Sequence, residues 1–441
     1  MIKFKISGAG GGKTTGLVEE IYCRYLKLKE YKKIFVITYT NYAVNQIINC
    51  YISRYGYLPS NIKIMTVHKF CIKEIINPYY KYVFCKNPIE GIVTFNYNHN
   101  RKFYEFSRYL EKNIIHSDNV FSMAKWILCG KSGFNKNQRQ LTSNAFKYFI
   151  SDIDSIFIDE YQDLDNDILD IVLKIVDNTK IYMSIVGDPK QHIMGTNYSH
   201  NFILEFKSRG IIPDYTKECF RCGKNLVNLS NKLCDDKEKQ ISNKPNMRLK
   251  YIFYEDLEPI VSILKSQGKE ILIYMRNSNE FFKTNKKVIN DFSVKVRDFS
   301  SFDTKYINKR INLIANNKYN LHSKIKEINK LLSEFKIELS KELYEQLLDY
   351  LEKNTITVDK SIEIYSINKV KGLEADYCFY IIDNIFLKYL NGNYEPNNER
   401  NKVYVALTRA KKELYIVIPK SFKKISDLEK LGIEKIDKIG E

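Results

Sequence analysis

The sequence has little cysteine and no long apolar run, and each deficit excludes a class of protein. Nine Cys spread over 441 residues are too dilute for a disulfide-stapled secreted scaffold, and their scatter predicts reduced thiols. No stretch approaches the ~18 uninterrupted apolar residues of a membrane span, and no apolar segment precedes the glycines near the N-terminus. We therefore expect an intracellular, cytoplasmic protein with no membrane partner, and leave a nuclear or viral-factory location open.

Acidic residues are also scarce relative to basic ones. The chain carries 52 Asp and Glu against 70 Lys and Arg, a formal net charge of +18. This excess favours an anionic partner such as nucleic acid, although Lys-, Asn-, Ile- and Tyr-rich usage with a single Trp also fits an AT-rich genome. The hydrophobic share of 44% is that of a packed chain, and at roughly 100–200 residues per domain the length predicts about two to four domains.

Apolar, β-branched runs alternate with helical patterns along most of the chain. The first residues predict a strand at 2–6, a Gly-rich loop and a helix at 14–28. Further strands are predicted at 34–38, 62–67, 155–159, 181–188, 270–275, 363–367, 377–382 and 413–418. Strands that alternate with helices favour parallel sheets built from right-handed βαβ units. The pattern therefore predicts an α/β fold with two parallel-sheet domains.

Two stretches interrupt the alternation and are predicted to be insertions. Residues 75–148 would interrupt a first core domain formed by 1–74 and 149–210. Residues 286–360 would interrupt a second one formed by 211–285 and 361–441. Apolar residues between Leu321 and Leu351 recur near 3.5-residue spacing, which favours a helical hairpin or long helix packed on its own domain over a coiled-coil partner site. The aromatic, basic segment 79–109 could stack on a nucleic acid, but a core or compositional explanation is favoured.

A Gly-rich segment between the first strand and helix has the composition of a phosphate-binding loop. In SGAGGGKTT, Lys13 would reach the β- and γ-phosphates and Thr14 would ligate Mg²⁺. Ser7 stands where the strict pattern has Gly, and a Gly-rich turn that happens to precede Lys-Thr is the alternative. We expect ATP or GTP to bind to the loop residues Gly8, Ala9, Gly10, Gly11, Gly12, Lys13, Thr14 and Thr15.

Two carboxylates follow the buried strand at 155–159. Asp159 would hold Mg²⁺, and Glu160 would orient or deprotonate the attacking water. The next predicted strand leads to Gln191, a polar sensor for the γ-phosphate. A capped strand end would explain the acidic pair alone equally well.

DEYQD (159–163) together with GDPKQ (187–191) resembles motifs II and III of the UvrD/Rep-like superfamily 1 DNA helicases. The other motifs follow in family order: TYTNYAVNQI, TVHKFC, CFRC, KGLE and ERNKVYVALTRAKKEL. DEYQD, KGLE and YVALTRAK are specific, whereas the rest are weak patterns taken singly. The resemblance implies two RecA-like (P-loop NTPase) domains, each with a small mainly helical insertion, that face each other across a site for ATP and Mg²⁺.

The resemblance also implies roles for single residues. Arg221 would reach the γ-phosphate, Phe220 would stack on adenine and Glu374 would contact the ribose. Arg409 would act as an arginine finger, so that hydrolysis depends on closure of the cleft. The residues that would contact single-stranded nucleic acid are Thr38, Tyr39, Thr40, Asn41, Thr66, His68 and Phe70, with Tyr198 as a displaced stacking residue. For His68, an ordinary surface histidine is an equally good interpretation.

Cys219 and Cys222 form a C-x-x-C that could indicate zinc, but no second pair follows at ligand spacing. The sequence favours an ATP-dependent DNA helicase or single-strand DNA translocase with 3′-to-5′ movement. One alternative is a DNA-stimulated NTPase subunit of a defence, repair or viral replication complex, with a partner such as a nuclease. Another is a nucleic-acid-binding scaffold with a vestigial ATPase, against which the intact Lys13, Glu160 and Arg409 argue.

Overall fold

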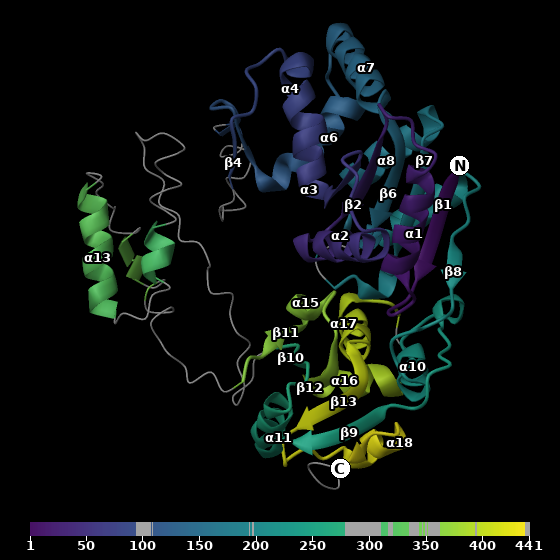
Figure 1. Ribbon diagram of the computed structural model, residues 1–441, viewed down its shortest axis with the longest axis vertical. Helices are drawn as coiled ribbons and strands as arrows, with labels where there is room; N and C mark the ends of the chain where they lie inside the picture. The colour runs from purple at the N-terminus through teal and green to yellow at the C-terminus, as the bar shows by residue number, and fades with distance from the viewer. Residues whose placement is uncertain are drawn as a thin grey trace.

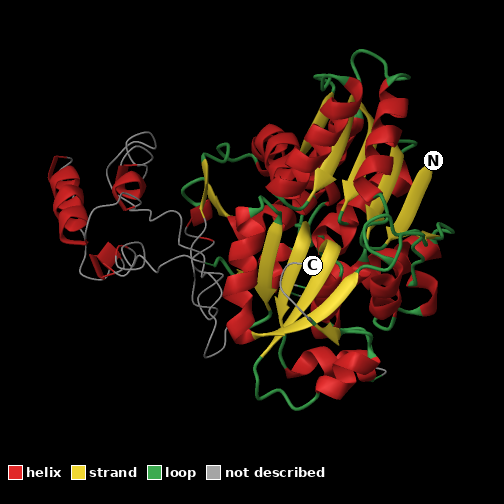
Figure 2. Cartoon of the chain, turned by 60° about the horizontal axis from the view of Figure 1, so that its bottom comes forward, coloured by secondary structure: helices red, strands yellow, loops and turns green. Residues whose placement is uncertain are grey.

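The computed structural model describes residues 1–93, 107, 109–193, 195, 198–277, 310–315, 321–334, 344–345, 347–348, 351, 362–392 and 395–436. These residues form two parallel six-stranded sheets and one small parallel pair, β4 (Gly91–Val93) with β5 (Ile114–His116). The two large sheets lie in separate bodies, each covered by helices (Figures 1 and 2). The prediction of two parallel-sheet α/β domains is confirmed.

The first sheet has the strand order β3-β2-β6-β7-β1-β8. Its strands are β1 (Ile2–Ser7), β2 (Lys33–Thr38), β3 (Ile62–Thr66), β6 (Ile153–Asp159), β7 (Tyr182–Gly187) and β8 (Asp214–Thr216). Alternate residues of one strand enter different cores: Ile34 and Val36 pack with α1 and α2, and Phe35 and Ile37 pack on the opposite face. Burial on both faces explains why these strands are continuous apolar runs.

Helices cover both faces of this sheet. They are α1 (Lys13–Tyr25), α2 (Asn41–Tyr55), α3 (Val67–Phe70), α4 (Asn77–Phe84), α6 (Val120–Cys129), α7 (Lys136–Ile150), α8 (Asn166–Asn178) and α9 (Ser199–Ser208). A π-helical segment, Cys71–Ile76, joins α3 to α4, so the expected start of the insertion at residue 75 lies inside a helical run. Tyr80, Val83 and Val120 share one hydrophobic core with the sheet. The described part of 75–148 is therefore a packed layer of the first domain; residues 94–106, within the aromatic segment, lie outside the description.

The second sheet has the order β11-β10-β12-β13-β9-β14. Its strands are β9 (Arg248–Phe253), β10 (Ile271–Met275), β11 (Tyr365–Ser366), β12 (Ala375–Ile381), β13 (Ala410–Ile418) and β14 (Glu434–Lys435). The helices around it are α10 (Lys224–Asn231), α11 (Tyr254–Ser266), α15 (Ile367–Val370), α16 (Asn384–Asn391), α17 (Asn398–Leu407) and α18 (Ile425–Lys430). Of the second predicted insertion, helix α13 (Leu321–Glu334) is described and confirms the helical expectation there, whereas most of 286–360 lies outside the described residues.

One predicted domain boundary is corrected, and one strand was missed. The boundary between the core domains was expected at residue 210, but β8 pairs in parallel with β1 and so extends the first sheet to Thr216. Strand β9 was not predicted, because Arg248 and Lys250 interrupt its apolar run; these cations lie next to Glu413 and Glu434 of the neighbouring strands. None of the helices among the described residues combines the length and the apolar character needed to cross a membrane.

Candidate nucleotide site

The Gly-rich loop lies between β1 and α1, as the sequence predicts. Gly10 and Gly12 have φ angles of 69° and 72°, a left-handed conformation that favours glycine. The Ser7 hydroxyl donates to the Gly11 carbonyl at 3.4 Å, and the Gly11 N–H donates to the Gly8 carbonyl at 3.2 Å. Ser7, the residue that departs from the strict motif, thus closes the loop without disturbing the start of α1 at Lys13.

The loop forms one wall of a cavity of about 350 Å³ that both domains line. The first domain contributes Gly10, Gly11, Gly12, Lys13, Thr14 and Thr15, and the second contributes Phe220, Arg221, Lys244, Glu374 and Lys411. Four of these side chains are cationic and one is anionic. A cleft with this charge balance at a helix N-terminus suits a polyphosphate.

The amino group of Lys13 and the acidic pair meet at the inner end of the loop. Lys13 Nζ is buried, has no hydrogen-bond partner among the described residues and lies 3.9 Å from Glu160 Oε1. Glu160 has a left-handed φ of 56°, unusual for a residue with a side chain, and its carboxylate accepts from the Gln162 amide. Such local strain is found where a side chain must be aimed, and here it directs Glu160 toward Lys13.

Asp159 is the buried member of the acidic pair. Burial, together with the charge of Glu160, raises the pKa of the Asp159 carboxyl to about 7. A divalent cation would relieve this repulsion, and hydroxyl and carboxylate oxygens from Thr14 and Asp159 are ligands that Mg²⁺ accepts together with substrate phosphates. The described residues contain no group of three His, Cys, Asp or Glu side chains that could hold a metal alone. The site therefore fits Mg²⁺ that arrives with a nucleotide, and the C-x-x-C shows no zinc-binding cluster.

Asp159→Asn is expected to stabilise the protein in the absence of nucleotide and Mg²⁺ at pH 8. The pKa of Asp159 in the folded protein lies above its ordinary value of 3.8, so ionisation of this carboxyl destabilises the folded state. The protein is therefore most stable, as far as Asp159 is concerned, below about pH 4, and it loses this stability as the pH rises to 7. Asn does not ionise, so we expect a gain of roughly 3–4 kcal/mol at pH 8 and of less than about 1 kcal/mol at pH 4, because each unit of pKa shift corresponds to about 1.4 kcal/mol. Urea unfolding at the two pH values measures this, and an equal gain at both would contradict it.

Gln191 and Asp188 form a buried pair beside the acidic residues. Gln191 Nε2 donates to Asp188 Oδ2 at 2.9 Å, and Lys190 Nζ lies 2.9 Å from the other carboxylate oxygen of Asp188. The strong partner Lys190 keeps the pKa of Asp188 below its usual value despite complete burial. Gln191 is thus held near the carboxyl end of β7. It is not one of the described residues that line the cavity.

Arg221, Glu374 and Phe220 lie together on the opposite wall. Arg221 forms an ion pair with Glu374 and donates to the Thr408 carbonyl at 3.0 Å. Phe220 is 58% exposed, with its ring 3.5 Å from where a Cβ on Gly12 would lie. Arg221, expected at the γ-phosphate, therefore contacts Glu374, expected at the ribose. The exposed ring of Phe220 can present a face to a base.

Arg409 is not where the arginine-finger expectation places it. Its guanidinium is buried in the second domain and donates to Val405 O, Leu373 O and Thr408 Oγ1 at 2.9, 3.2 and 3.1 Å. It does not line the cavity in the described structure. Burial, reinforced by the nearby charge of Arg221, lowers the pKa of Arg409. Two carbonyl oxygens and one hydroxyl of its own domain accept from the guanidinium, which explains why it does not extend toward the cleft.

Two cationic residues of the cavity were missed by the sequence interpretation. Lys411 lies 3.1 Å from Glu270 and 3.8 Å from Glu374, and Lys244 donates to the Arg221 carbonyl at 3.3 Å. Lys411 follows Arg409 by two residues inside TRAKK, so the motif contained a signal for it. Lys244 lies in a loop and has no comparable signal.

The residues expected to contact nucleic acid fall into two groups. Tyr39, Thr40 and Asn41 are exposed at the start of α2, where Thr40 accepts from the Ala43 N–H. Thr66 caps α3, His68 packs against Phe121 with ring centroids 4.3 Å apart, and Tyr198 is half-buried just before α9. These six residues remain candidates for strand contacts.

Thr38 and Phe70 are corrected, because both side chains belong to the protein interior. Thr38 is 0% exposed at the end of β2. Phe70 packs against Phe35 and Phe149, with ring centroids 5.4 and 6.0 Å away. Neither side chain is exposed where a strand could contact it.

The second domain contacts the first again beside α2. Lys371 Nζ donates to Asp163 Oδ1 at 2.6 Å, across the two domains. The same loop brings Gly372 close to Tyr42, whose ring lies 3.6 Å from where a Cβ on Gly372 would lie. The exposed Tyr39–Asn41 segment therefore lies next to a junction between the domains.

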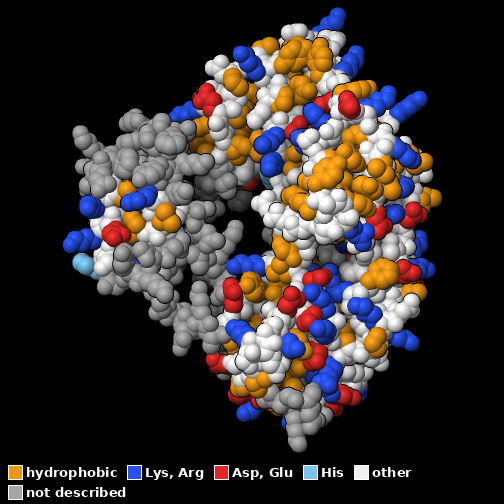
Figure 3. Space-filling view, viewed as in Figure 1, with side chains coloured by type: hydrophobic (Ala, Val, Ile, Leu, Met, Phe, Trp, Pro, Cys, Tyr) orange, Lys and Arg blue, Asp and Glu red, His pale blue; other side chains and the backbone are white. Residues whose placement is uncertain are grey.

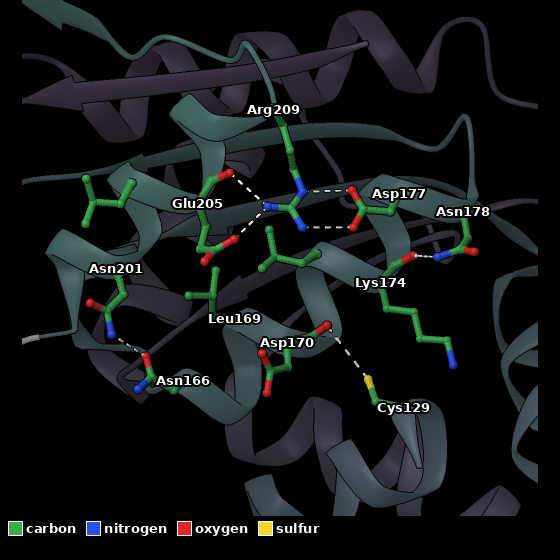
Figure 4. Close-up of a pocket in the computed structure, with 12 residues that line it drawn as sticks. Cys129, Asn166, Leu169, Asp170, Lys174, Asp177, Asn178, Asn201, Glu205 and Arg209 are labelled. Atoms are coloured by element: carbon green, nitrogen blue, oxygen red, sulfur yellow. Dashed lines mark hydrogen bonds and ion pairs between the residues drawn. The ribbon is translucent and has the colours of Figure 1, made fainter. Parts of the chain in front are cut away.

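A larger hollow of about 760 Å³ lies elsewhere on the first domain, along α8 and α9 (Figure 4). Its cations are already engaged: Arg209 pairs with Asp177 and Glu205, and Lys174 donates to the Leu128 carbonyl. No described cation there is left to receive a phosphate, so the smaller cavity at the Gly-rich loop is the candidate site.

Two family models match the chain, a AAA domain over residues 3–197 and a UvrD-like helicase C-terminal domain over 361–417. The chain belongs to the UvrD-like superfamily 1 helicases. The first match contains the Gly-rich loop with Asp159 and Glu160, and the second contains Glu374 and Arg409. The two parallel sheets of this UvrD-like helicase are accordingly its two RecA-like domains.

Individual proteins similar to this UvrD-like helicase are distant from it. The Gabija protein GajB of Bacillus cereus (strain VD045) is 25% identical over 488 aligned positions, which cover 96% of this chain and 93% of that protein. The PRRSV helicase structure is 11% identical, with a TM-score of 0.35, and covers 96% of this chain and 53% of its own. A complex of Arterivirus nonstructural protein 10 (helicase) with DNA is 12% identical, with a TM-score of 0.38 and coverages of 97% and 62%. The chain thus spans between about half and three fifths of these solved structures.

Proposed function

We propose that this UvrD-like helicase hydrolyses ATP with Mg²⁺ and uses the energy to move 3′-to-5′ along single-stranded DNA. The observation that carries the proposal is the cavity that both domains line, with Lys13 on one wall and Arg221 on the other. A triphosphate between these cations would attract both walls, and its hydrolysis would release them. ATP binding would in this way bring the two domains together, and hydrolysis would let them separate.

The positions of the side chains support the following roles. Lys13 would neutralise the β- and γ-phosphates, and Glu160 would activate the attacking water. Thr14 and Asp159 would hold Mg²⁺, which would offset the negative charge of the phosphates. Arg221 leaves Glu374 for the γ-phosphate when the nucleotide enters, and Glu374 then becomes available to the ribose. Phe220 stacks on the adenine. The buried Arg409 would add positive charge near Arg221. It needs a change of side-chain conformation to reach the phosphate itself.

The exposed residues at the start of α2 support a strand path beside the junction of the domains. Tyr39, Asn41 and Tyr42 present aromatic and amide groups on the first domain, and Lys371 and Gly372 approach from the second. A strand held by both sides would be released and regripped as the cleft opens and closes. Lys and Arg side chains are scattered over both domains on the face seen in Figure 3, so the excess charge is not confined to one patch there.

A second candidate function is favoured by the packing of the first insertion. Its described helices α4, α6 and α7 share the core of the first sheet instead of forming a separate body that could hold a duplex. We therefore also consider a DNA-stimulated NTPase subunit that works with a protein partner, such as a nuclease or a replication or defence factor, and does not unwind alone. A nucleic-acid-binding scaffold with a vestigial ATPase is a third, weaker candidate.

Strand displacement and ATP hydrolysis, measured together, distinguish these functions. We expect single-stranded DNA to stimulate hydrolysis at least tenfold, and a duplex with a 3′ tail to be separated faster than one with a 5′ tail. Strand affinity is expected to fall steeply between 50 and 200 mM salt, because phosphate contacts release counterions. Stimulated hydrolysis without displacement would favour the subunit, displacement only from 5′ tails would contradict the polarity, and no hydrolysis would leave the scaffold.

A further inference from the structure

Three residues form a closed ring of hydrogen bonds across the two domains. The Ala9 N–H of the Gly-rich loop donates to the Tyr404 hydroxyl at 3.0 Å. The Tyr404 hydroxyl donates to Gln240 Oε1 at 3.2 Å, and Gln240 Nε2 donates back to the Ala9 carbonyl at 3.3 Å. Ala9, Tyr404 and Gln240 are 2%, 1% and 6% exposed, so water does not compete for these bonds.

The ring fits the loop closely. A Cβ on Gly8 would lie 2.2 Å from Gln240 Oε1, so the loop accepts the Gln240 side chain only because residue 8 is glycine. The Phe220 N–H donates to the Gly10 carbonyl at 2.8 Å, a further bond between the domains at the next residue. Both peptide groups of Ala9 therefore take their partners from the second domain, and a shift of the loop cannot leave that domain unaffected.

Tyr404 lies on α17, which also contacts the other parts of the nucleotide site. Its ring lies 5.3 Å from Lys190 Nζ, and Lys190 pairs with Asp188, the residue that holds Gln191. One turn earlier, Asn401 donates to the His192 carbonyl at 2.8 Å. At the end of the helix, the Thr408 carbonyl accepts from Arg221. One helix thus connects the loop, the Gln191 turn and Arg221.

We propose that Tyr404 and Gln240 are positioning residues that couple occupation of the Gly-rich loop to the orientation of α17. Through α17 they would also affect Arg221 and the domain junction where Lys371 meets Asp163. This inference rests on the proposed ATP hydrolysis and DNA binding. Neither side chain is assigned a contact with ATP. Their role is to transmit movement, because each bond of the ring is buried and water cannot replace a lost partner. Two further bonds strengthen the link: Gln240 Nε2 also donates to the Glu218 carbonyl at 3.2 Å, and Cys219 Sγ donates to the Ala9 carbonyl at 3.3 Å.

Coupling between two ligands is measured directly by their mutual effect on affinity. The dissociation constant of a non-hydrolysable ATP analogue is measured with and without a saturating poly-dT oligonucleotide. We expect the wild-type chain to bind the analogue at least tenfold more tightly with the oligonucleotide. In Tyr404→Phe and Gln240→Met this ratio is expected to fall below threefold, while affinity without the oligonucleotide stays within threefold of wild type. The double variant should lose no more than either single one, because both act in one ring.

Tyr380→Phe is the matched control. Tyr380 is also a fully buried tyrosine of the second domain, but its hydroxyl has no hydrogen-bond partner among the described residues. We expect it to keep the wild-type ratio. The inference would be overturned if Tyr404→Phe and Gln240→Met kept the wild-type affinity ratio, or if Tyr380→Phe lowered the ratio as much as they do. Either result would leave the proposed function intact. A wild-type chain that binds the analogue equally with and without the oligonucleotide would overturn both.

Discussion

Lys13→Ala is expected to reduce ATP hydrolysis at least a thousandfold, with and without single-stranded DNA. Lys13 Nζ is buried, and its nearest ionic neighbour, Glu160, is 3.9 Å away, so no strong ion pair among the described residues competes with a phosphate. A cation placed where charge develops contributes several kcal/mol to the transition state, and a thousandfold corresponds to about 4 kcal/mol. Steady-state phosphate release measures the loss.

The fold is expected to survive this substitution. Lys13 is the first residue of α1, outside both hydrophobic cores of the first sheet. Lys5→Ala removes the same charge from an exposed position on the preceding strand and is the matched control. Circular dichroism should be unchanged in both variants, and hydrolysis should be lost only in the first. Retained hydrolysis in a folded Lys13→Ala protein would refute the assignment of the loop.

The two arginines of the second domain are expected to differ in how much they contribute to stability. Arg221→Ala should lower kcat at least a hundredfold with little change in the free energy of unfolding, because its ion pair with Glu374 is partly exposed and such pairs contribute at most about 1 kcal/mol. Arg409→Ala should lower the free energy of unfolding by about 2–4 kcal/mol, because it removes a large buried side chain and its three hydrogen bonds.

Arg409→Met separates packing from charge. Met fills much of the same volume, and the protein no longer has to bury a cation close to Arg221, so we expect stability within about 1 kcal/mol of wild type. If Arg409 turns to the phosphate during the cycle, the same variant should still lose at least a hundredfold in kcat. Urea unfolding and phosphate release on the three variants provide both numbers. A fully active Arg409→Met protein would make Arg409 purely structural.

The features that the sequence predicted well depend on local chemistry. Strands such as β2 and β7 are recognisable because burial on both faces favours apolar residues at most positions. The Gly-rich loop is recognisable because the conformations of Gly10 and Gly12 and the position of Lys13 are set within nine residues. Asp159 and Glu160 follow from the end of a buried strand.

The features that the sequence did not predict depend on which way a side chain faces or on distant partners. A motif gives the positions of Thr38 and Phe70, but the packing of the sheet turns both side chains inward. Arg409 faces inward because the carbonyl of Leu373, 36 positions away in the sequence, accepts from it. The ring of Ala9, Gln240 and Tyr404 joins residues separated by up to 395 positions, so it exists only once both domains have folded and met.

The central claim is that the cleft between the two domains hydrolyses ATP in response to single-stranded DNA, with Glu160 activating the water. The most direct test is phosphate release by wild type and Glu160→Gln, each with and without a poly-dT oligonucleotide, beside the affinity of each for ATP. We expect DNA-stimulated release by wild type, and from Glu160→Gln at least a hundredfold less release with ATP affinity within threefold of wild type. Equal release by the two proteins, or a wild-type rate indifferent to DNA, would contradict the account.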